Sequence, residues 1–435
     1  MHRLRSLLVS IRSSLWFVPT LMVGGAIALA IALVETDRLF HFQWAEDYPL
    51  LFGAGAEGSR GMLSTIAGSM ITVAGVTFSL TIAALVTASG QYTSRILRNF
   101  MRDVRNQVVL GSFVGIFTYC LVVLRTIRGG AEVTFVPSLA VFAALVLALV
   151  GIGVLVFFIH HIATSIQAST IVRRITDEAF EAMDHLFPEG SANEALDGEA
   201  SDWGGGPYES IPSPAMGYVQ SVDLAKALSI AQQHGALVRL EAQPGEFVAP
   251  SSVLMSVSCP SPLGEEAREK LCAAVAIRRF RTINEDLGFG LRQLVDIALK
   301  ALSPGINDTT TAVMCIDHIG AVLARLAPRA MPTHHRSEDG RIRLVAPGPR
   351  FDTLADAAFD QIRASASGNA AALAAVMSAI SRASAHTSDP ARLRSLQLQA
   401  TMVSELAESS IATEHDRAAV RHARGCVNTQ GVADS

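Results

Sequence analysis

Residues 133–159 read VTFVPSLAVFAALVLALVGIGVLVFFI, and none of them carries a charge. The hydrocarbon core of a bilayer is about 30 Å thick, and a helix of about 20 apolar residues crosses it. Because lipid offers the backbone no hydrogen-bond partners, an uncharged stretch of this length is expected to be a helix rather than a strand. Residues 133–159 therefore predict a transmembrane helix.

Three further stretches lack charged side chains, namely Leu15–Val34, Gly61–Ser94 and Gln107–Leu124. The sequence therefore predicts a membrane α-helical fold with four transmembrane helices, at about residues 15–34, 63–90, 107–125 and 134–160.

The first stretch has an alternative interpretation as a cleaved signal peptide. Basic residues precede it, and Ala28-Leu29-Ala30 is similar to a cleavage site. However, its 20 apolar residues exceed the roughly 7–15 residues of a signal peptide's apolar core. A retained helix is therefore favoured.

The composition agrees with a membrane protein. The chain has 435 residues, of which 50% are hydrophobic and 17% charged, whereas soluble domains average about 25% charged residues. The net charge of −4 excludes a basic nucleic-acid-binding protein. None of the five cysteines stands in a C-x-x-C pair, so neither a disulfide framework nor a zinc ribbon is indicated.

The arginines predict the orientation, because cytoplasmic loops are enriched in Lys and Arg. One side of the membrane would carry nine arginines: Arg3, Arg5, Arg12, Arg95, Arg98, Arg102, Arg105, Arg173 and Arg174. The other side would carry four: Arg38, Arg60, Arg125 and Arg128. We therefore expect the N- and C-termini in the cytoplasm.

Composition also divides the chain. Residues 188–215 contain six acidic residues and no basic one, together with a Gly204-Gly205-Gly206 run, which is typical of a flexible linker. The predicted parts are a basic cytoplasmic N-terminus (1–14), the transmembrane domain (15–160), a cytoplasmic extension of the fourth helix (161–187), the acidic linker (188–215), a cytoplasmic α+β domain (216–412) and a loose tail (413–435).

Within the α+β domain, short alternating runs predict strands at 218–222, 236–240 and 253–257, which would form a small β-barrel or sandwich. An Asp-Gly pair followed by an alternating run predicts a β-hairpin over 338–345. Apolar residues at helical spacing predict helical structure over 265–326, 355–363, 370–385 and 390–408.

Two segments resemble a known family. The first runs through Ser69-Met70-Ile71-Thr72-Val73-Ala74-Gly75-Val76-Thr77-Phe78-Ser79, and the second through Lys300-Ala301-Leu302-Ser303-Pro304-Gly305-Ile306-Asn307-Asp308. Together they are similar to the bacterial membrane proteins called domain of unknown function 2254. The resemblance implies the inner membrane of a bacterium and brings no established activity. Thr93 is a departure, since the family usually has proline there.

The second predicted span carries the first candidate site. Gly68, Thr72, Gly75 and Ser79 recur at helical spacing and would form one face of small residues and hydroxyls. Such a face is able to line a pore or substrate path. The alternative is close packing between helices, with the hydroxyls bonded back to their own helix.

The second candidate is a polar cluster in the cytoplasmic domain. Arg292 and Asp296 are four residues apart on a predicted helix, Asp286 precedes them, and Asn307 with Asp308 follows a helix break at Pro304-Gly305. Polar groups beside a helix N-terminus are able to bind an anion or a nucleotide. The alternative is an ion pair plus a helix cap that hold two helices together.

Other motifs are weak. The chain has no Walker A, G-x-S-x-G or H-E-x-x-H motif, so we expect no enzyme, no catalytic residues, no cofactor and no metal. The sequence favours an oligomeric channel or passive transporter regulated by its cytoplasmic domain. The alternative is a membrane-anchored sensor or scaffold that binds an unknown cytoplasmic ligand or partner protein. The expected partners are the lipid bilayer and further copies of the chain, and no nucleic acid.

Overall fold

The computed structural model describes residues 16–39, 55–91, 103–128, 135–187, 208–332, 335–338 and 341–428. The chain divides into two compact units, Met1–Gln167 and Ala168–Ser435. The predicted N-terminal segment 1–14 and most of the acidic linker, 188–207, lie outside the described residues.

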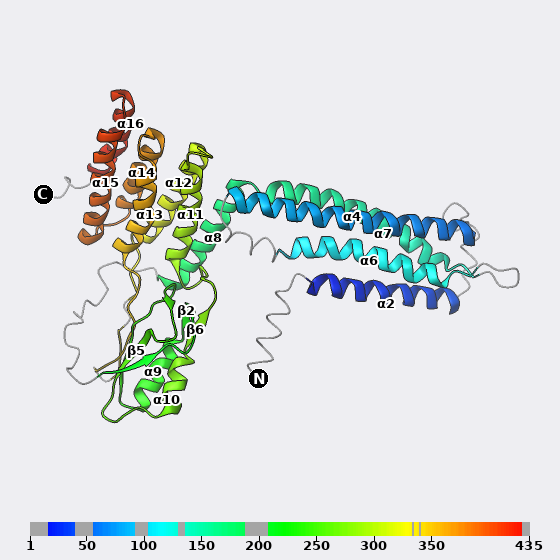
Figure 1. Cartoon of the computed structure of the whole chain (residues 1–435), viewed down its shortest axis with the longest axis horizontal. Coiled ribbons are helices and arrows are strands. Elements are labelled where there is room, and N and C mark those ends of the chain that lie inside the picture. The colour runs from blue at the N-terminus through cyan, green and yellow to red at the C-terminus, as the bar shows by residue number, and fades with distance from the viewer. Residues whose placement is uncertain are drawn as a thin grey trace. The chain divides into compact units, whose positions relative to one another are not determined.

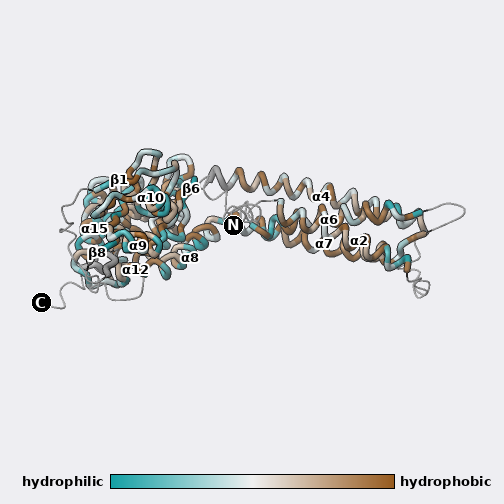
Figure 2. The backbone as a smooth tube through the Cα atoms, turned by 90° about the horizontal axis from the view of Figure 1, so that it is seen from below, coloured by the Kyte–Doolittle hydropathy of each residue, from teal (hydrophilic) through white to brown (hydrophobic). Residues whose placement is uncertain are grey.

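The described residues of the first unit contain four long apolar helices: α2 (Phe17–Leu39), α4 (Ala56–Gln91), α6 (Val104–Thr126) and α7 (Ser138–Ser165). They run side by side, and hydrophobic residues predominate along their lengths (Figures 1 and 2). Each is long and apolar enough to cross a membrane. The prediction of four membrane-spanning helices is therefore confirmed at the level of length and composition.

The third helix, α6, is the centre of this unit, because α2, α4 and α7 all pack on it. Glycines permit the closest approach. A Cβ atom at Gly111 would lie 2.7 Å from Sδ of Met22 and 3.0 Å from Cα of Pro19, so any larger residue would push α2 away. Large side chains such as Phe113 and Tyr119 are fully buried among the four helices.

The end of α2 holds the beginning of α7. Both Oδ atoms of Asp37 accept the backbone N–H of Leu139, and Oδ2 also accepts that of Ala140, at distances of 3.1–3.3 Å. The residue that precedes α7, Pro137, makes no side-chain cap of its own. Asp37 therefore satisfies, from a different helix, the free N–H groups at the start of α7.

The fourth helix does not continue unbroken as the sequence predicts. Helix α7 ends at Ser165, and a new helix, α8, runs from Ala168 to Leu186. The hydroxyl of Ser165 donates to the carbonyl of Ile162 and so bonds back to the last turn of α7. Neither glycine nor proline marks this break, and for that reason the periodicity of the sequence does not reveal it.

The second unit contains a helical part and a part built on two sheets (Figure 1). The helical part comprises α8, α11 (Leu287–Leu302), α12 (Thr309–Leu326), α13 (Phe351–Ser365), α14 (Ala370–Ser384), α15 (Pro390–Ser410) and α16 (Glu414–Asn428). Helix α8 packs on α11 and α12. The Cβ atom of Ala179 would lie only 3.3 Å from a Cβ added at Gly290, so a small residue is needed where α8 and α11 cross.

The strands form two sheets, with α9 (Leu224–Gln233) and α10 (Glu265–Cys272) beside them. One sheet has the order β1 (Glu209–Pro212), β5 (Val253–Ser258), β3 (Leu237–Leu240), β8 (Arg341–Val345) and β7 (His335–Glu338). The other has the order β4 (Phe247–Val248), β2 (Gly217–Val222) and β6 (Val275–Arg278). All described pairs are antiparallel except β3 with β8.

Several boundaries differ from the predictions. The described strands close no barrel, so the barrel alternative is wrong. Strand β6 interrupts the stretch 265–326 that was predicted as helical, β1 lies within the predicted linker, and α16 occupies most of the predicted loose tail. The strands predicted at 218–222, 236–240 and 253–257 and the hairpin over 338–345 are confirmed as β2, β3, β5 and β7–β8 within a few residues.

Candidate functional site

The small-residue face of α4 points away from the other described helices. Gly68, Thr72, Gly75 and Ser79 are all exposed, and a Cβ added at either glycine would meet nothing within 4 Å. Helix α4 packs instead through its opposite side, which buries Leu63, Ala67, Met70 and Ala74. The sequence allows this face to serve for close packing between helices. Within the described residues, the face makes no such contact.

Several hydroxyls on α4 bond to the backbone of their own helix. Thr72 Oγ1 donates to the carbonyl of Gly68 at 2.8 Å. Thr65 and Thr87 donate in the same way to Gly61 and Ala83, at 2.8 and 2.9 Å. Since a hydroxyl has one proton and two lone pairs, these side chains offer only acceptors to a neighbour.

In the second unit, Asp286 is the N-cap of α11. Its Oδ1 accepts the N–H of Phe289 at 3.0 Å, and its Oδ2 accepts Nε of Arg281 at 2.8 Å. Gly245 lies over the carboxylate, with φ +92°, and a Cβ there would clash with Asp286 Oδ2. Burial raises the pKa of Asp286 above its ordinary value of 3.8, although Arg281 opposes the shift.

Arg292 and Asp296 form an ion pair on α11, with 2.8 Å between Nε and Oδ1. Their side chains are 36% and 18% exposed. An i,i+4 pair that reaches solvent contributes less than about 1 kcal/mol. The pair is a stabilising contact along one helix.

Asn307 and Asp308 connect α11 to α12. Asn307 has the left-handed φ of +49° that reverses the chain, and Asp308 caps α12 by accepting the N–H of Thr311 at 3.0 Å. The hydrogen bonds from Thr311 lower the pKa of Asp308 below its usual range.

The five predicted residues therefore do not form one site. Asp286 and Asp308 cap different helices and lie near opposite ends of α11, whose 16 residues span about 24 Å. The geometry favours the structural interpretation of the cluster, in which caps and an ion pair fix two helices.

The structure brings together one polar pair that the sequence does not indicate. His161 Nε2 lies 3.0 Å from Oδ2 of Asp103, which is also the N-cap of α6. His161 is 8% exposed and stacks on Phe157. Adjacent histidines do not face one another on a helix, and the sequence gives no sign that Asp103 reaches α7.

Two buried arginines were also missed. Arg329, 5% exposed, donates to the carbonyls of Met183 and Phe187 at 3.0 and 2.9 Å and pairs with Asp184 at 2.7 Å. Arg392, also 5% exposed, donates to the carbonyls of Ala327 and Arg329. These guanidinium groups donate to carbonyls at or just beyond the C-terminal ends of α8 and α12.

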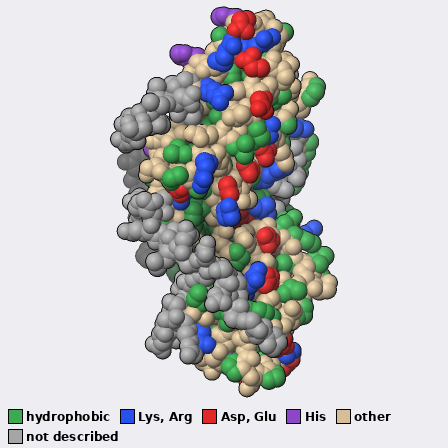
Figure 3. All heavy atoms as spheres, turned by 90° about the vertical axis from the view of Figure 1, so that its left-hand side faces the viewer, with side chains coloured by type: hydrophobic (Ala, Val, Ile, Leu, Met, Phe, Trp, Pro, Cys, Tyr) green, Lys and Arg blue, Asp and Glu red, His purple; other side chains and the backbone are tan. Residues whose placement is uncertain are grey.

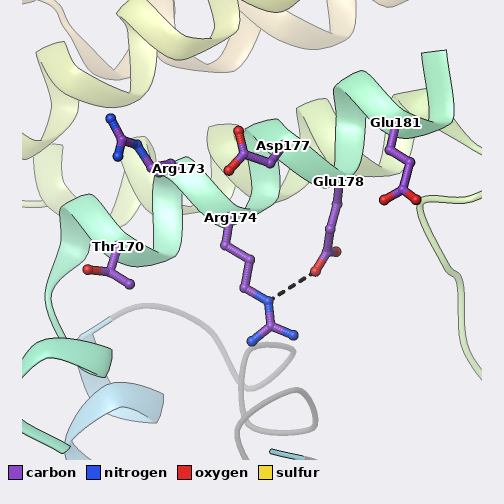
Figure 4. A pocket seen from close by; sticks show the side chains of 6 residues that line it. All are labelled: Thr170, Arg173, Arg174, Asp177, Glu178 and Glu181. Atoms are coloured by element: carbon purple, nitrogen blue, oxygen red, sulfur yellow. Dashed lines mark hydrogen bonds and ion pairs between the residues drawn. The ribbon is translucent and has the colours of Figure 1, made fainter. Parts of the chain in front are cut away.

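The outer face of α8 lines a pocket of about 450 Å³. Its lining residues are Thr170, Arg173, Arg174, Asp177, Glu178 and Glu181. Arg174 and Glu178 are paired at 3.1 Å, and Arg173 and Asp177 point to the other side of the helix (Figure 4). The pocket therefore offers both positive and negative groups.

The described residues contain no group of three or more His, Cys, Asp or Glu placed to hold a metal ion. On the face that Figure 3 shows, acidic and basic side chains lie interspersed with hydrophobic ones. That face presents no extended surface of a single charge.

The family model described as "Predicted membrane protein (DUF2254)" matches residues 12–382. The chain belongs to the DUF2254 family. This DUF2254 protein is 33% identical to Uncharacterized protein Mb1321c of Mycobacterium bovis and to Uncharacterized protein Rv1290c of Mycobacterium tuberculosis, over 97% of its own length and 81% of theirs. No solved structure matches it. The membership agrees with the resemblance seen in the sequence, and the family's description names a membrane protein without an activity.

Proposed function

We propose that this DUF2254 protein is an oligomeric channel or passive transporter that its second unit regulates. The exposure of the α4 face carries the proposal. Gly68, Thr72, Gly75 and Ser79 point away from the chain's own helices, whereas the space among the four helices is filled by side chains such as Phe113 and Tyr119. A hydrated path would therefore lie between copies of the chain, with α4 from each copy at its wall.

The chemistry of this wall favours cations. Because Thr72 on this face donates its proton to the carbonyl of Gly68, its hydroxyl would present oxygen lone pairs to the wall. Oxygen acceptors replace the hydration shell of a small cation, as carbonyls do in cation channels. The middle of α4 has no ionisable side chain, which favours passive flow over coupling to protons.

The arginine asymmetry supports an inner-membrane protein with both termini and the second unit in the cytoplasm. The second unit follows the fourth span after only Ile166 and Gln167. In this proposal, a ligand or partner of the second unit would act on the channel through α8.

Flux measurements on the full protein in liposomes test the proposal. Wild-type protein should release trapped K⁺. Thr72→Leu should reduce the flux, because leucine removes an oxygen and adds bulk at the wall, while the oligomer stays assembled. Thr20→Leu makes the same change at an exposed position of α2 and should leave the flux unchanged.

The outcomes separate the two uses of the face. If Thr72→Leu dissociates the oligomer or lowers its melting temperature, the face is a packing interface between helices. Added bulk at such a contact lowers the free energy of unfolding by about 1–3 kcal/mol. If wild-type protein conducts neither K⁺, Na⁺ nor a small organic cation, the channel is ruled out.

A sensor or scaffold is the second candidate, and the pocket on α8 favours it. Arg173 and Asp177 are four residues apart and still make no ion pair with each other within the described structure. A ligand that carries both charges would match them. Calorimetry with the full protein and candidate zwitterionic metabolites would detect such binding, and Arg173→Ala should abolish it.

A further inference from the structure

A buried histidine joins two of the long helices at one end of the first unit. Nε2 of His161, on α7, lies 3.0 Å from Oδ2 of Asp103. Oδ1 of the same carboxylate accepts the N–H of Arg105 at 2.9 Å and so caps α6. One carboxylate therefore contacts both the start of α6 and the last turns of α7, and its partner on α7 is a group that titrates.

The hydrogen of this contact belongs to the histidine. An ionised carboxylate only accepts hydrogen bonds, so Nε2 of His161 donates to Asp103, and Nδ1 is the atom that takes up a second proton. The charge of an imidazole ordinarily changes between about pH 5 and 8. The contact therefore has two states, one with a neutral imidazole as donor and one with an imidazolium that forms an ion pair with the carboxylate.

The packing around His161 favours a strong effect of its charge. The residue is 8% exposed, and solvent screens a buried pair of charges much less than an exposed one. The ring of Phe157 is stacked on the imidazole, with 5.8 Å between the ring centres, and an aromatic face attracts a cation at such a distance. Both Asp103 and Phe157 thus bind the imidazolium more strongly than the neutral imidazole.

Few other charged groups lie on the helices that pack against α7. On α6, Arg105 follows Asp103 and is exposed, and on α7 itself the exposed His160 precedes His161. Within the described residues, α2 has no ionisable side chain before Glu35, and α4 has none after Arg60. Asp103 is therefore the acid that responds to a proton on His161.

We propose that His161 and Asp103 form a proton-sensitive link between α6 and α7. Uptake of a proton at Nδ1 of His161 adds the attraction of opposite charges to the existing hydrogen bond, and loss of that proton weakens the contact. The link acts on α6, the helix on which α2, α4 and α7 all pack. The inference goes beyond the proposed channel, because it requires no transported ion.

Titration of His161 in the full protein is the first test. In nanodiscs, nitrogen-labelled histidine gives separate signals for Nδ1 and Nε2, and the signals that vanish in His161→Gln identify His161. We expect Nδ1 to gain a proton between pH 8 and pH 5.5, while Nε2 keeps its own throughout. Signals of His161 that stay unchanged over this range would overturn the proposal.

Hydrogen exchange measures the strength of the link. After correction for the intrinsic rate, amides in residues 104–110 of α6 and 158–165 of α7 should exchange about tenfold more slowly at pH 5.5 than at pH 8, because a hydrogen bond between charged partners is the stronger one. Residues 112–123, further along α6, are the internal reference and should show no such difference. Equal corrected exchange of residues 104–110 at both pH values would overturn the proposal without any variant.

Three variants assign the response to this pair. His161→Gln keeps an N–H donor but does not titrate, so its corrected exchange should be the same at both pH values. Asp103→Asn keeps an oxygen that caps α6 but has no charge, so it should lose most of the tenfold difference. His160→Gln, at the exposed neighbour, should retain the difference in full. A response that persists in His161→Gln or in Asp103→Asn would overturn the proposal.

Discussion

A single histidine in the second unit illustrates how burial sets protonation. His318 on α12 lies with Nδ1 2.8 Å from the hydroxyl of Thr176 on α8. Thr176 also donates its hydroxyl proton to the carbonyl of Val172 at 2.9 Å, so Nδ1 of His318 is the atom that donates to Thr176. Burial lowers the pKa of His318 below its ordinary value of 6.5. The charges of Asp317 and Asp177 raise this pKa, and that of Arg173 lowers it further. Burial is the largest of these effects, so the pKa remains lowered.

The lowered pKa of His318 makes stability depend on pH. Between the folded pKa and 6.5 the unfolded chain binds more protons, so the free energy of unfolding rises with pH across that window and falls on acidification. The apparent melting temperature of the full protein should therefore drop between pH 7.5 and 5.5. His318→Gln keeps an N–H donor for Thr176 and should show a smaller drop, whereas His415→Gln on α16 should behave like wild type. Identical pH profiles for wild type and His318→Gln would contradict the assignment.

Helix ends decide how the elements of the second unit are joined. Asp286 and Asp308 cap α11 and α12, while Arg329 holds the C-terminal end of α8. The sequence predicts a cap at Asn307 or Asp308, because these polar residues precede a run of threonines after a helix break. Nothing in the sequence indicates Arg329, since its partners are backbone carbonyls of a helix about 145 residues earlier and are brought to it only by the packing of α8 on α12.

Asp308→Ala should lower the free energy of unfolding by about 1 kcal/mol, because the N–H groups at the start of α12 lose their acceptor. Asp308→Asn keeps an acceptor and should lower the free energy of unfolding by only a few tenths of that 1 kcal/mol. Arg292→Ala, which removes a partly exposed ion pair, should cost less than about 1 kcal/mol. Denaturant unfolding of the full protein in detergent measures all three. A loss from Arg292→Ala well above that from Asp308→Ala would show that the ion pair has a role beyond the helix.

At the scale of the whole molecule, the orientation in the membrane is the first property to measure. Because arginines are concentrated before the first span, between the second and third spans and after the fourth, reporter fusions at Arg105 and at the C-terminus should report the cytoplasm. A fusion at Asp47 should report the opposite side. A cytoplasmic fusion at Arg105 together with a C-terminal fusion outside the cytoplasm would contradict two spans between them.

The apolar stretches predict the four spans to within several residues, because a helix that is exposed to lipid has to be apolar along its whole length. Their packing is not predictable in the same way. Gly111 and Gly151 make the close contacts between spans, whereas the small residues of α4 that attract attention in the sequence make none with the described helices. Which glycine faces a neighbour depends on the rotation of each helix, and a sequence that is apolar on all sides does not fix that rotation.

The central position of α6 has a consequence for synthesis at the ribosome. Helices α2 and α4 are made first, yet both pack mainly on α6, and the cap that Asp37 provides acts on α7. The first two spans therefore enter the membrane before their main partners exist. Insertion of the third span brings the nascent helices together, and a chain that stalls before Val104 would expose unassembled helices to membrane proteases.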